Sequence, residues 1–392
     1  MKIGILTYHK EVNAGATVQT YCLYKLIASL FPYAQVEVID YCPFWAFKKQ
    51  LRNHFQFRKF PFFINKAFIN KKKYLYNFLD KEIKLSKNFL ISDNIEKTIA
   101  FIQEQNYDVI IVGSDTVWGV SAKNARFPNA YFLPGITSST KVAFAVSADP
   151  VTQQTIKLFH KKENLLNIRK ALESFSFISV RDEATFSLLE AIGVSGNDIN
   201  FMPDPTFLYD FEKIVEDSFY SCRRHDKFTV GLQIGEDRLI FKKLQKMLRK
   251  EKINFIDFFS FDKQYSSFSL EEHLGAYRKI DLMITDRFHG SIFTLKIRKC
   301  PVIFLESPQK WPLQNSKGRS LFRLMGLEHM VYRYKYEDFS FNLLEKYKNG
   351  WDLSEAEVKK RLDGIKEKFQ KEIVKFMATI NKEEVEATNL RK

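Results

Sequence analysis

The residues best suited to chemistry lie in TDRFHGS, residues 285–291, directly after the apolar run LMIT. If this stretch is extended, Arg287 and His289 project to the same side, and Gly290 lets a following helix begin close to a ligand. An arginine fork suits a carboxylate or phosphate, the helix N-terminus adds donors, and an imidazole can transfer a proton. The segment predicts an anion site with a general acid beside it. The structural alternative is an arginine paired with a nearby aspartate and a histidine that closes a turn.

A second arginine follows another apolar run, FISV at 177–180. Asp182 is suited to cap the helix that begins there, and Arg181 would then face the same cleft as Arg287. Two arginines brought from two domains would hold a small, multiply charged anion. The alternative is that Arg181 only pairs with Glu183 or with a helix-end carbonyl.

A carboxylate and an indole occur together in GSDTVW, residues 113–118, after the most apolar predicted strand. Ser114 and Asp115 would lie at the sheet edge, with Trp118 within one turn. This pairing is common in sugar sites, because the acid accepts hydroxyl protons and the ring packs on C–H faces. The equally simple alternative is that Asp115 caps a turn and Trp118 is a core residue.

Two further segments are weaker candidates. The loop and helix start YHKEVNAGATVQ carries His9, Asn13 and Gln19 near the end of the first predicted strand, and we expect it to line the same cleft, although a single loop histidine is usually incidental. The tripeptide that starts at Asp204 reads DPT, which is mainly a turn signature.

The elements that must position these residues alternate between strand and helix. Continuous apolar runs predict strands at 2–6, 36–40, 107–113, 141–146, 177–180 and 199–202, and again at 228–234, 254–259, 282–285 and 302–305. Amphipathic stretches predict helices at 17–30, 93–105 (capped by Ser92 or Asp93), 152–173, 182–191, 237–250, 270–278 and 291–296. Such alternation is typical of α/β domains with parallel sheets, in which ligands bind at the carboxyl ends of the strands.

The predicted organisation is two α/β domains followed by a helical tail. Residues 1–210 form the first domain, with an insertion at 44–84, and residues 228–345 form the second. The charge-mixed stretch 209–227 is the predicted hinge. In the tail, residues 352–392, apolar side chains recur at helical spacing, so we expect an amphipathic helix packed on one or both domains.

The chain of 392 residues is 45% hydrophobic and carries a formal net charge of +15. That composition excludes disorder. The charge concentrates between Asp40 and Asp80, where basic and aromatic residues interleave and no acidic residue occurs. This predicts a helical, partly exposed insertion that docks on an anionic membrane. The alternatives are a charged outer face over a Phe-rich core, or a nucleic-acid-binding surface, which we do not expect because no recognition motif is present.

The sequence lacks the motifs of several common enzyme and nucleotide-binding classes. The sequence has no phosphate loop, dinucleotide fingerprint, zinc-protease helix, nucleophile elbow or DxD pair, so metal-dependent chemistry loses support and no metal is expected. No apolar run is long enough to span a membrane. Four cysteines without paired spacing and an N-terminus without a signal segment indicate a reduced, cytoplasmic protein, with any membrane contact peripheral.

Taken in order, these motifs resemble the polysaccharide pyruvyl transferase family over about residues 1–305. The segments that carry the resemblance are the turn from Asn13 to Ala16 with Gln19, GSD-x-x-W, SVR-[DE], DPT and R-x-H-G. The sequence departs from the family pattern at Ala14 and at the Ala148–Asp149 pair, which puts the acceptor pocket in question.

The resemblance implies two facing Rossmann-like domains of the GT-B type and transfer of pyruvate from phosphoenolpyruvate to a sugar, as a ketal, without a cofactor. It implies His289 as the general acid, Arg287, Arg181 and Gly290 as donor-binding residues, and the first domain as the acceptor side. The acceptor-binding residues would be Asp115, Ser114, Trp118, Asn13 and Gln19. The acceptor would be a bacterial-type surface glycan precursor, such as a lipid-linked one. Two rivals remain: a metal-independent GT-B glycosyltransferase that uses a sugar nucleotide, and a nucleic-acid-binding protein.

Overall fold

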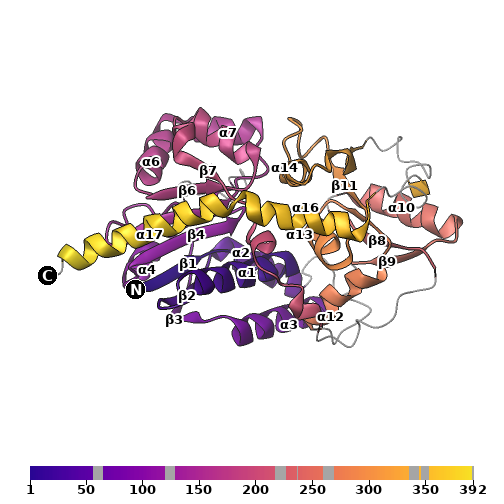
Figure 1. Cartoon of the computed structure of the whole chain (residues 1–392), viewed down its shortest axis with the longest axis horizontal. Helices are drawn as coiled ribbons and strands as arrows, with labels where there is room; N and C mark the ends of the chain where they lie inside the picture. The colour runs from indigo at the N-terminus through magenta and orange to yellow at the C-terminus, as the bar shows by residue number, and fades with distance from the viewer. Residues whose placement is uncertain are drawn as a thin grey trace. The chain divides into compact units, whose positions relative to one another are not determined.

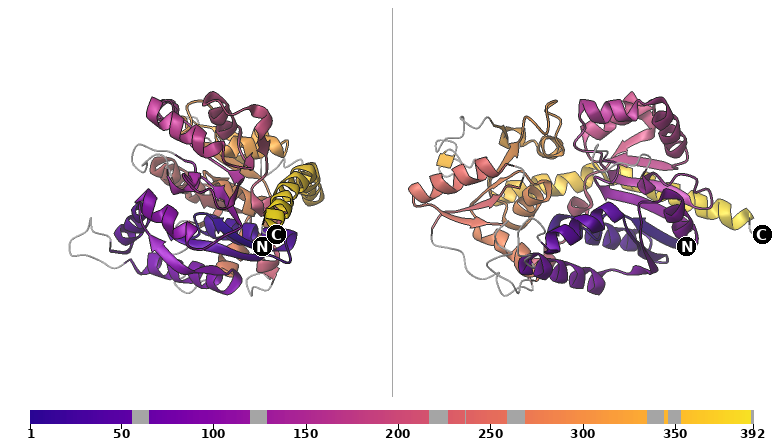
Figure 2. Two further views of the ribbon diagram at one scale, coloured as in Figure 1. Left: turned by 90° about the vertical axis from the view of Figure 1, so that its left-hand side faces the viewer. Right: turned by 180° about the vertical axis from the view of Figure 1, so that it is seen from behind.

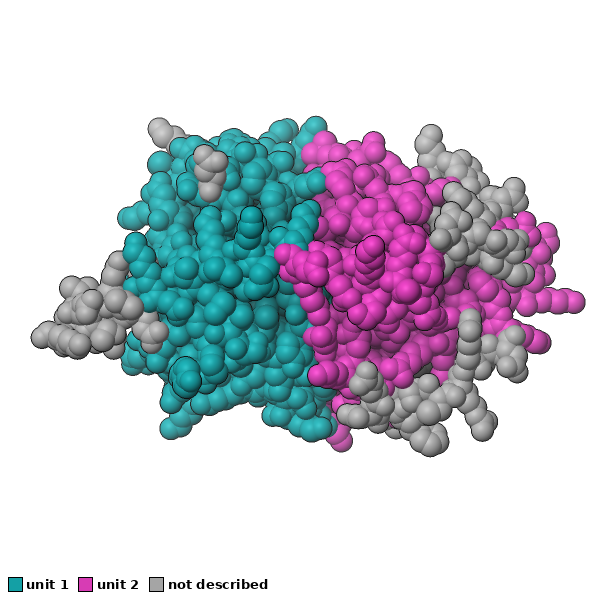
Figure 3. Space-filling view, viewed as in Figure 1, with its two compact units in different colours: residues 1–65, 76–209, 368–392 teal, residues 66–75, 210–367 magenta. Residues whose placement is uncertain are grey.

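The computed structural model describes residues 1–55, 65–119, 129–216, 227–235, 237–258, 269–334, 344–345 and 353–390 (Figure 1). Residues 56–64 of the predicted insertion and 217–226 of the predicted hinge lie outside them. The chain forms two compact units (Figure 3). Unit 1 comprises Met1–Asn65, Tyr76–Tyr209 and Lys368–Lys392, and unit 2 comprises Lys66–Leu75 and Asp210–Glu367.

Unit 1 is built on a seven-stranded parallel sheet with the strand order β3-β2-β1-β4-β5-β6-β7. Its strands are β1 (Lys2–Leu6), β2 (Gln35–Cys42), β3 (Leu85–Ile91), β4 (Val109–Asp115), β5 (Thr140–Val146), β6 (Phe177–Val180) and β7 (Ile199–Phe201). The central strands β4 and β5 are buried on both faces, which explains why their sequences are continuous apolar runs.

The helices of unit 1 lie between or after its strands in the chain, and one helix joins them from the C-terminal region. They are α1 (Ala14–Leu30), α2 (Phe44–Phe55), α4 (Ile95–Gln103), α5 (Gln153–Phe159), α6 (Lys162–Leu172), α7 (Glu183–Ala191), α8 (Pro205–Leu208) and α17 (Gln370–Leu390), with the short turn η1 (Ala130–Phe132); α3 (Lys66–Glu82) belongs partly to unit 2. Two predictions were wrong in detail. Asn94, not Ser92 or Asp93, caps α4, and the single helix expected at 152–173 is interrupted at His160.

Unit 2 contains a five-stranded parallel sheet with the order β12-β11-β10-β8-β9. Its strands are β8 (Thr229–Gln233), β9 (Asn254–Asp257), β10 (Leu282–Thr285), β11 (Val302–Glu306) and β12 (Val331–Arg333). Its helices are α9 (Lys213–Glu216), α10 (Arg238–Lys250), α12 (Leu270–Gly275) with η4 (Ala276–Lys279), α13 (Phe288–Phe293) with η5 (Thr294–Arg298), α14 (Lys317–Leu324), η6 (Glu328–Met330) and α16 (Glu355–Lys368). The two parallel sheets confirm the predicted α/β class.

The C-terminal helices confirm the predicted helical tail, and α17 covers a sheet face that the crossovers leave open. The helices after β5 and β6 pack on one face, with Ile178 and Leu188 in the same core cluster. On the other face, the ring of Phe376 in α17 contacts Phe144 of β5 and Phe177 of β6 at 5.2 and 5.6 Å between ring centroids. Figure 2 shows this yellow helix running along the sheet of unit 1. The face would otherwise expose aromatic rings to water.

Among the described helices, none combines the length and the apolar character needed to cross a bilayer.

We predict that Phe376→Ala lowers the free energy of unfolding by about 3–5 kcal/mol, because a fully buried ring leaves a cavity behind. Urea denaturation followed by circular dichroism measures the change. Val374→Ala, on the same helix but 55% exposed, is the matched control and should change stability by less than about 0.5 kcal/mol. Equal effects of the two substitutions would show that α17 does not form part of the core of unit 1.

Candidate functional site

Both sheets contain a topological switch point, and the residues selected from the sequence follow the strands that form it. In unit 1, β1 and β4 are neighbours whose connections leave in opposite directions; in unit 2, the same holds for β8 and β10. Ligands of open α/β sheets bind at such points, outside the carboxyl ends of the strands. Asp115 ends β4, and Arg287 follows β10 by two residues. Each unit therefore contributes one candidate site.

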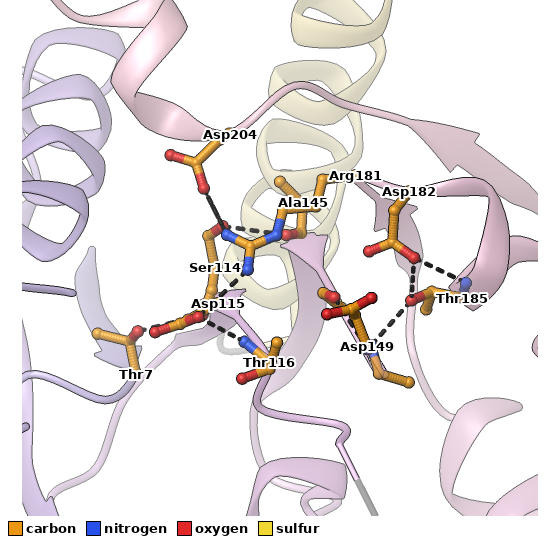
Figure 4. Close-up of polar contacts among 12 residues, drawn as sticks. Thr7, Ser114, Asp115, Thr116, Ala145, Asp149, Arg181, Asp182, Thr185 and Asp204 are labelled. Carbon is orange, nitrogen blue, oxygen red and sulfur yellow. Dashed lines mark hydrogen bonds and ion pairs between the residues drawn. The ribbon is translucent and has the colours of Figure 1, made fainter. Parts of the chain in front are cut away.

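In unit 1, Arg181 is the centre of a buried polar network (Figure 4). Its guanidinium donates to the carboxylate of Asp204, to Oδ1 of Asp115 at 3.2 Å and to Oγ of Ser114 at 3.4 Å. The side chain of Arg181 is only 1% exposed. Carboxylates therefore occupy the arginine fork that the sequence analysis assigned to the donor, and direct donor binding by Arg181 is not what this geometry favours.

The charge on Arg181 is stabilised despite its burial. Burial lowers the pKa of an arginine, but the nearby carboxylates of Asp204, Asp115 and Asp182 outweigh that effect, so the pKa of Arg181 lies above its usual value. Asp204 is itself held by Thr206, whose backbone N and Oγ1 donate to Oδ1 at 3.1 and 2.7 Å. The DPT turn thus positions the main counter-ion of Arg181.

The turn that carries Ser114 and Asp115 is fixed from several elements. Gln19 of α1 is fully buried, and with its amide oxygen facing the turn, Oε1 accepts from the backbone N of Ser114 at 3.0 Å and of Asp115 at 3.1 Å. Oγ of Ser114 donates to the carbonyl of Ala145 on β5 at 3.0 Å, and Oγ1 of Thr7 donates to the carbonyl of Ser114 at 3.3 Å. Gln19 and Ser114 are therefore supports of the turn.

Asp115 is the residue that this framework presents. Its φ is 80°, in the left-handed region that costs a non-glycine residue about 1–3 kcal/mol and that is found preferentially at functional sites. Gly113 before it has a φ of 138°, and an added Cβ would lie 2.1 Å from the carbonyl oxygen of Phe144. The Asp115 side chain is 14% exposed. Its carboxylate is the least buried charged group of the network.

Two other acceptor-side predictions have structural roles. Trp118 was expected to pack on a sugar, and this is wrong: the side chain is 1% exposed, its Nε1 donates to the carbonyl of Tyr131 at 3.1 Å, and its ring stacks on Phe132. An aromatic residue near a carboxylate cannot be distinguished from a core aromatic by sequence. Asn13 caps α1, where its side chain accepts from the backbone N of Gly15 at 3.0 Å. His9 is buried, and its Nε2 lies 3.1 Å from Oδ1 of Asp40.

Asp149 lies beside this network (Figure 4), and Ala148 precedes it in the chain. The backbone N of Ala148 donates to Oγ1 of Thr185 at 2.8 Å, and Thr185 also donates to Asp182, which caps α7 as predicted. Burial, reinforced by the charge of Asp149, raises the pKa of the Asp182 carboxyl. The Ala148–Asp149 pair thus interacts with the cap of α7.

In unit 2, Arg287 lies at the switch point and is more accessible than Arg181. Its side chain is 38% exposed, and its Nε lies 3.0 Å from Oδ1 of Asp286. Asp286 also accepts from the backbone N of Gly235, after β8, at 3.0 and 3.2 Å. The ion pair expected as the structural alternative therefore exists. It holds the guanidinium at the carboxyl edge of the sheet and leaves part of the side chain exposed to solvent.

The geometry around His289 differs from the predicted one. Helix α13 begins at Phe288, three residues earlier than expected, so the chain is extended at Arg287 but helical at His289. The two side chains do not follow strand alternation. His289 is half-buried, and its ring lies 6.1 Å from that of Phe293 between centroids.

Sequence reasoning missed Gln233 and Tyr277. A Cβ on Gly290 would lie 1.8 Å from Oε1 of Gln233, so a larger residue at position 290 would require the Gln233 side chain to move. The hydroxyl of Tyr277 donates to the same Oε1 at 3.3 Å. Gly290 therefore has a packing role in this unit. The signal for Gln233 was its position at the end of a predicted strand.

The residues around Arg181 belong to unit 1, and the residues around Arg287 belong to unit 2. The expectation that Arg181 and Arg287 face one cleft remains a prediction. Among the described residues, no group of three or more His, Cys, Asp or Glu side chains gathers in a way that could hold a metal ion.

Comparison with known proteins gives a family and a fold. The family model for polysaccharide pyruvyl transferase matches residues 13–307. No curated protein is similar enough in sequence to count as a relative. Among solved structures, a co-structure of S. aureus MnaA with UDP is 10% identical, with a TM-score of 0.52 over 91% of this chain and 90% of that one. A protein described as a UDP-N-acetylglucosamine 2-epimerase from Listeria monocytogenes is also 10% identical, with a TM-score of 0.53 over 94% and 97%. These likenesses confirm the GT-B type of fold.

We predict that Asp204→Asn destabilises the protein by about 3–5 kcal/mol, because it leaves the buried charge of Arg181 without its main partner while preserving side-chain shape. The free energy of unfolding in urea measures this. Asp363→Asn is the matched control: the same substitution at an exposed pair with Lys359 should cost about 0.5 kcal/mol or less. If Asp204→Asn lowered the free energy of unfolding no more than Asp363→Asn, the buried charge of Arg181 would not depend on the Asp204 carboxylate.

Proposed function

Because the chain belongs to the polysaccharide pyruvyl transferase family, we propose that it transfers pyruvate from phosphoenolpyruvate to two hydroxyls of one sugar, forming a ketal. The proposed acceptor is a precursor of a bacterial-type surface polysaccharide, carried on a lipid. The observation that carries the proposal is the position of a partly exposed guanidinium, Arg287, and a half-buried imidazole, His289, both directly after β10 at the switch point of unit 2.

The reaction requires an acid and a cation. The methylene carbon of phosphoenolpyruvate gains one proton and becomes a methyl group, and C2 bonds to the first sugar oxygen. The second sugar oxygen then bonds to C2 as the bond from C2 to the phosphate oxygen breaks. Phosphate leaves, and the two hydroxyl protons balance the new methyl proton and the protonation of phosphate. Protonation at carbon needs a positioned acid, and the charged donor needs a counter-charge.

His289 is the proposed acid. Its ring is half-buried beside Phe293, which limits its orientations. Arg287 is the proposed ligand of the donor's carboxylate or phosphate, because a guanidinium binds such groups through two parallel hydrogen bonds. Asp286 and Gly235 hold that arginine at the end of β10.

In unit 1, Asp115 is the proposed contact with the sugar, since its carboxylate can accept hydrogen bonds from hydroxyl groups. Arg181, Ser114 and Gln19 are positioning residues in this proposal, because each contacts Asp115 or its backbone and all three are buried. The proposal thus moves Arg181 from the donor to the support of the acceptor side.

We predict that substitutions at Arg287 and His289 separate binding from turnover. His289→Ala should lower kcat by about 10²–10⁴ with little change in donor affinity, the usual contribution of a positioned general acid. Arg287→Ala should instead weaken phosphoenolpyruvate binding strongly, because the anion loses a charge-assisted partner. Phosphate release measures turnover, and calorimetry measures binding. The exposed residues His160 and Arg238 supply matched alanine controls, which should behave like the wild type.

A solvent isotope experiment tests the same step independently. In D₂O the pyruvyl methyl group of the product should contain one solvent deuterium, seen by mass spectrometry. Wild-type turnover in His289→Ala would remove this residue from the mechanism. A large thermal stabilisation by a nucleotide sugar, with none by phosphoenolpyruvate, would overturn the proposed reaction in favour of glycosyl transfer.

A further inference from the structure

We propose that helix α2 of unit 1 docks on the surface of a membrane that contains anionic lipid. This goes beyond the proposed reaction and does not depend on it, because docking can be measured without any substrate.

The outer ridge of α2 combines apolar and basic side chains. Phe44, Lys48, Leu51 and Phe55 are spaced by four, three and four residues, so they lie along one face of the helix. All four are exposed: Phe44 by 48% and Leu51 and Phe55 by 38% each. Arg52 is exposed beside them. We call these five residues the α2 ridge.

The opposite face of α2 is anchored to unit 1. Ala46 and Gln50 are buried. Nε2 of Gln50 donates to the carbonyl of Lys10 at 2.6 Å, and its Oε1 accepts from the hydroxyl of Tyr76 at 3.2 Å. These contacts define which face is buried, so the α2 ridge is presented to solvent by a fixed helix.

The exposed apolar side chains of α2 are not scattered at random. Ten large apolar residues are exposed in the described part of the chain, and three of them lie on the α2 ridge. Single exposed apolar residues need no explanation, but three on one helical face with basic neighbours are the pattern of helices that lie in a membrane interface. On such a helix the rings and Leu51 enter the boundary of the acyl chains while the cations meet lipid phosphates.

The charges favour an anionic partner. Neither Lys48 nor Arg52 pairs with an acidic residue in the described structure, whereas Lys49, on another face, pairs with Glu11 at 3.5 Å. The sequence contains no acidic residue between Asp40 and Asp80, so no carboxylate on α2 opposes this charge. A membrane fits better than a nucleic acid, because the aliphatic Leu51 lies between the two rings and offers no stacking surface for bases.

The test is sedimentation of the full chain with vesicles of neutral phosphatidylcholine, or of phosphatidylcholine with 30% phosphatidylglycerol, at about 50 and 300 mM salt. We expect binding to the anionic vesicles that weakens as salt increases. The variant Lys48→Gln/Arg52→Gln should bind about 10-fold to 30-fold more weakly. The variant Phe44→Ser/Leu51→Ser/Phe55→Ser should lose about tenfold or more.

Two matched controls separate the α2 ridge from general surface properties. Lys242→Gln/Lys246→Gln removes the same charge from exposed positions of α10. Leu166→Ser/Leu239→Ser/Leu313→Ser removes three leucines that are 61%, 64% and 47% exposed elsewhere. Both should bind vesicles like the wild type, and all variants should keep the wild-type melting temperature.

Equal binding to neutral and anionic vesicles would overturn the proposal. So would losses in the α10 or leucine controls that match those in the α2 variants, because binding would then follow net charge or general stickiness. Binding to single-stranded RNA that requires Lys48 and Arg52, without binding to vesicles, would also overturn it and assign the α2 ridge to nucleic acid.

Discussion

The ion pairs of Arg181 are the interaction on which the organisation of unit 1 depends. One guanidinium joins Asp115 at the end of β4 to Asp204, which caps α8 after β7, while Arg181 itself follows β6. A buried charge is costly unless it is paired and hydrogen-bonded, so these three chain segments stabilise the fold only when all of them meet at the carboxyl edge of the sheet. The same requirement fixes the direction of the Asp115 carboxylate. Stability and the geometry of the candidate site therefore have one physical origin.

Close backbone approach is the second constraint, and it acts in both units. Gly113 has no room for a Cβ against the backbone carbonyl of Phe144, and a Cβ on Gly290 would displace the side-chain amide of Gln233. In each case the glycine lies at a switch point and lets a polar turn or a helix approach the end of a neighbouring strand. A side chain at Gly113 would push apart β4 and β5 at the turn that carries Asp115, whereas one at Gly290 would require the Gln233 side chain to reorient. The two sheets have different strand orders, but each has a glycine close to the end of a neighbouring strand.

The parts of the fold that could be predicted from the sequence were the strands with uninterrupted apolar residues. Strands such as β4 and β10 were predicted because both faces are covered, which leaves no polar interruption. The edge strand β3 was missed because Lys87, Asn88 and Phe89 are exposed and break the apolar pattern.

At the candidate site, the sequence motifs located the correct turns but did not predict which side chains form ion pairs. Asp204 lies 23 residues from Arg181, and no local sequence pattern reveals such a pair. The start of α13 was placed too late because glycine and histidine are weak helix formers, whereas the helix begins at Phe288, whose side chain is buried.

Arg181 and Arg287 differ in burial, and this difference suits them to different roles. Arg181 is 1% exposed and is held by two carboxylates, so it can orient another group but has little access to a ligand. Arg287 is 38% exposed with one carboxylate beside it, so an incoming anion can approach without first breaking a buried network. Breaking one partner from a buried pair costs about 3–5 kcal/mol, whereas an exposed pair costs about 1 kcal/mol or less. A ligand anion would therefore reach Arg287 at a lower cost than Arg181, although both arginines follow a strand at the carboxyl edge of a parallel sheet.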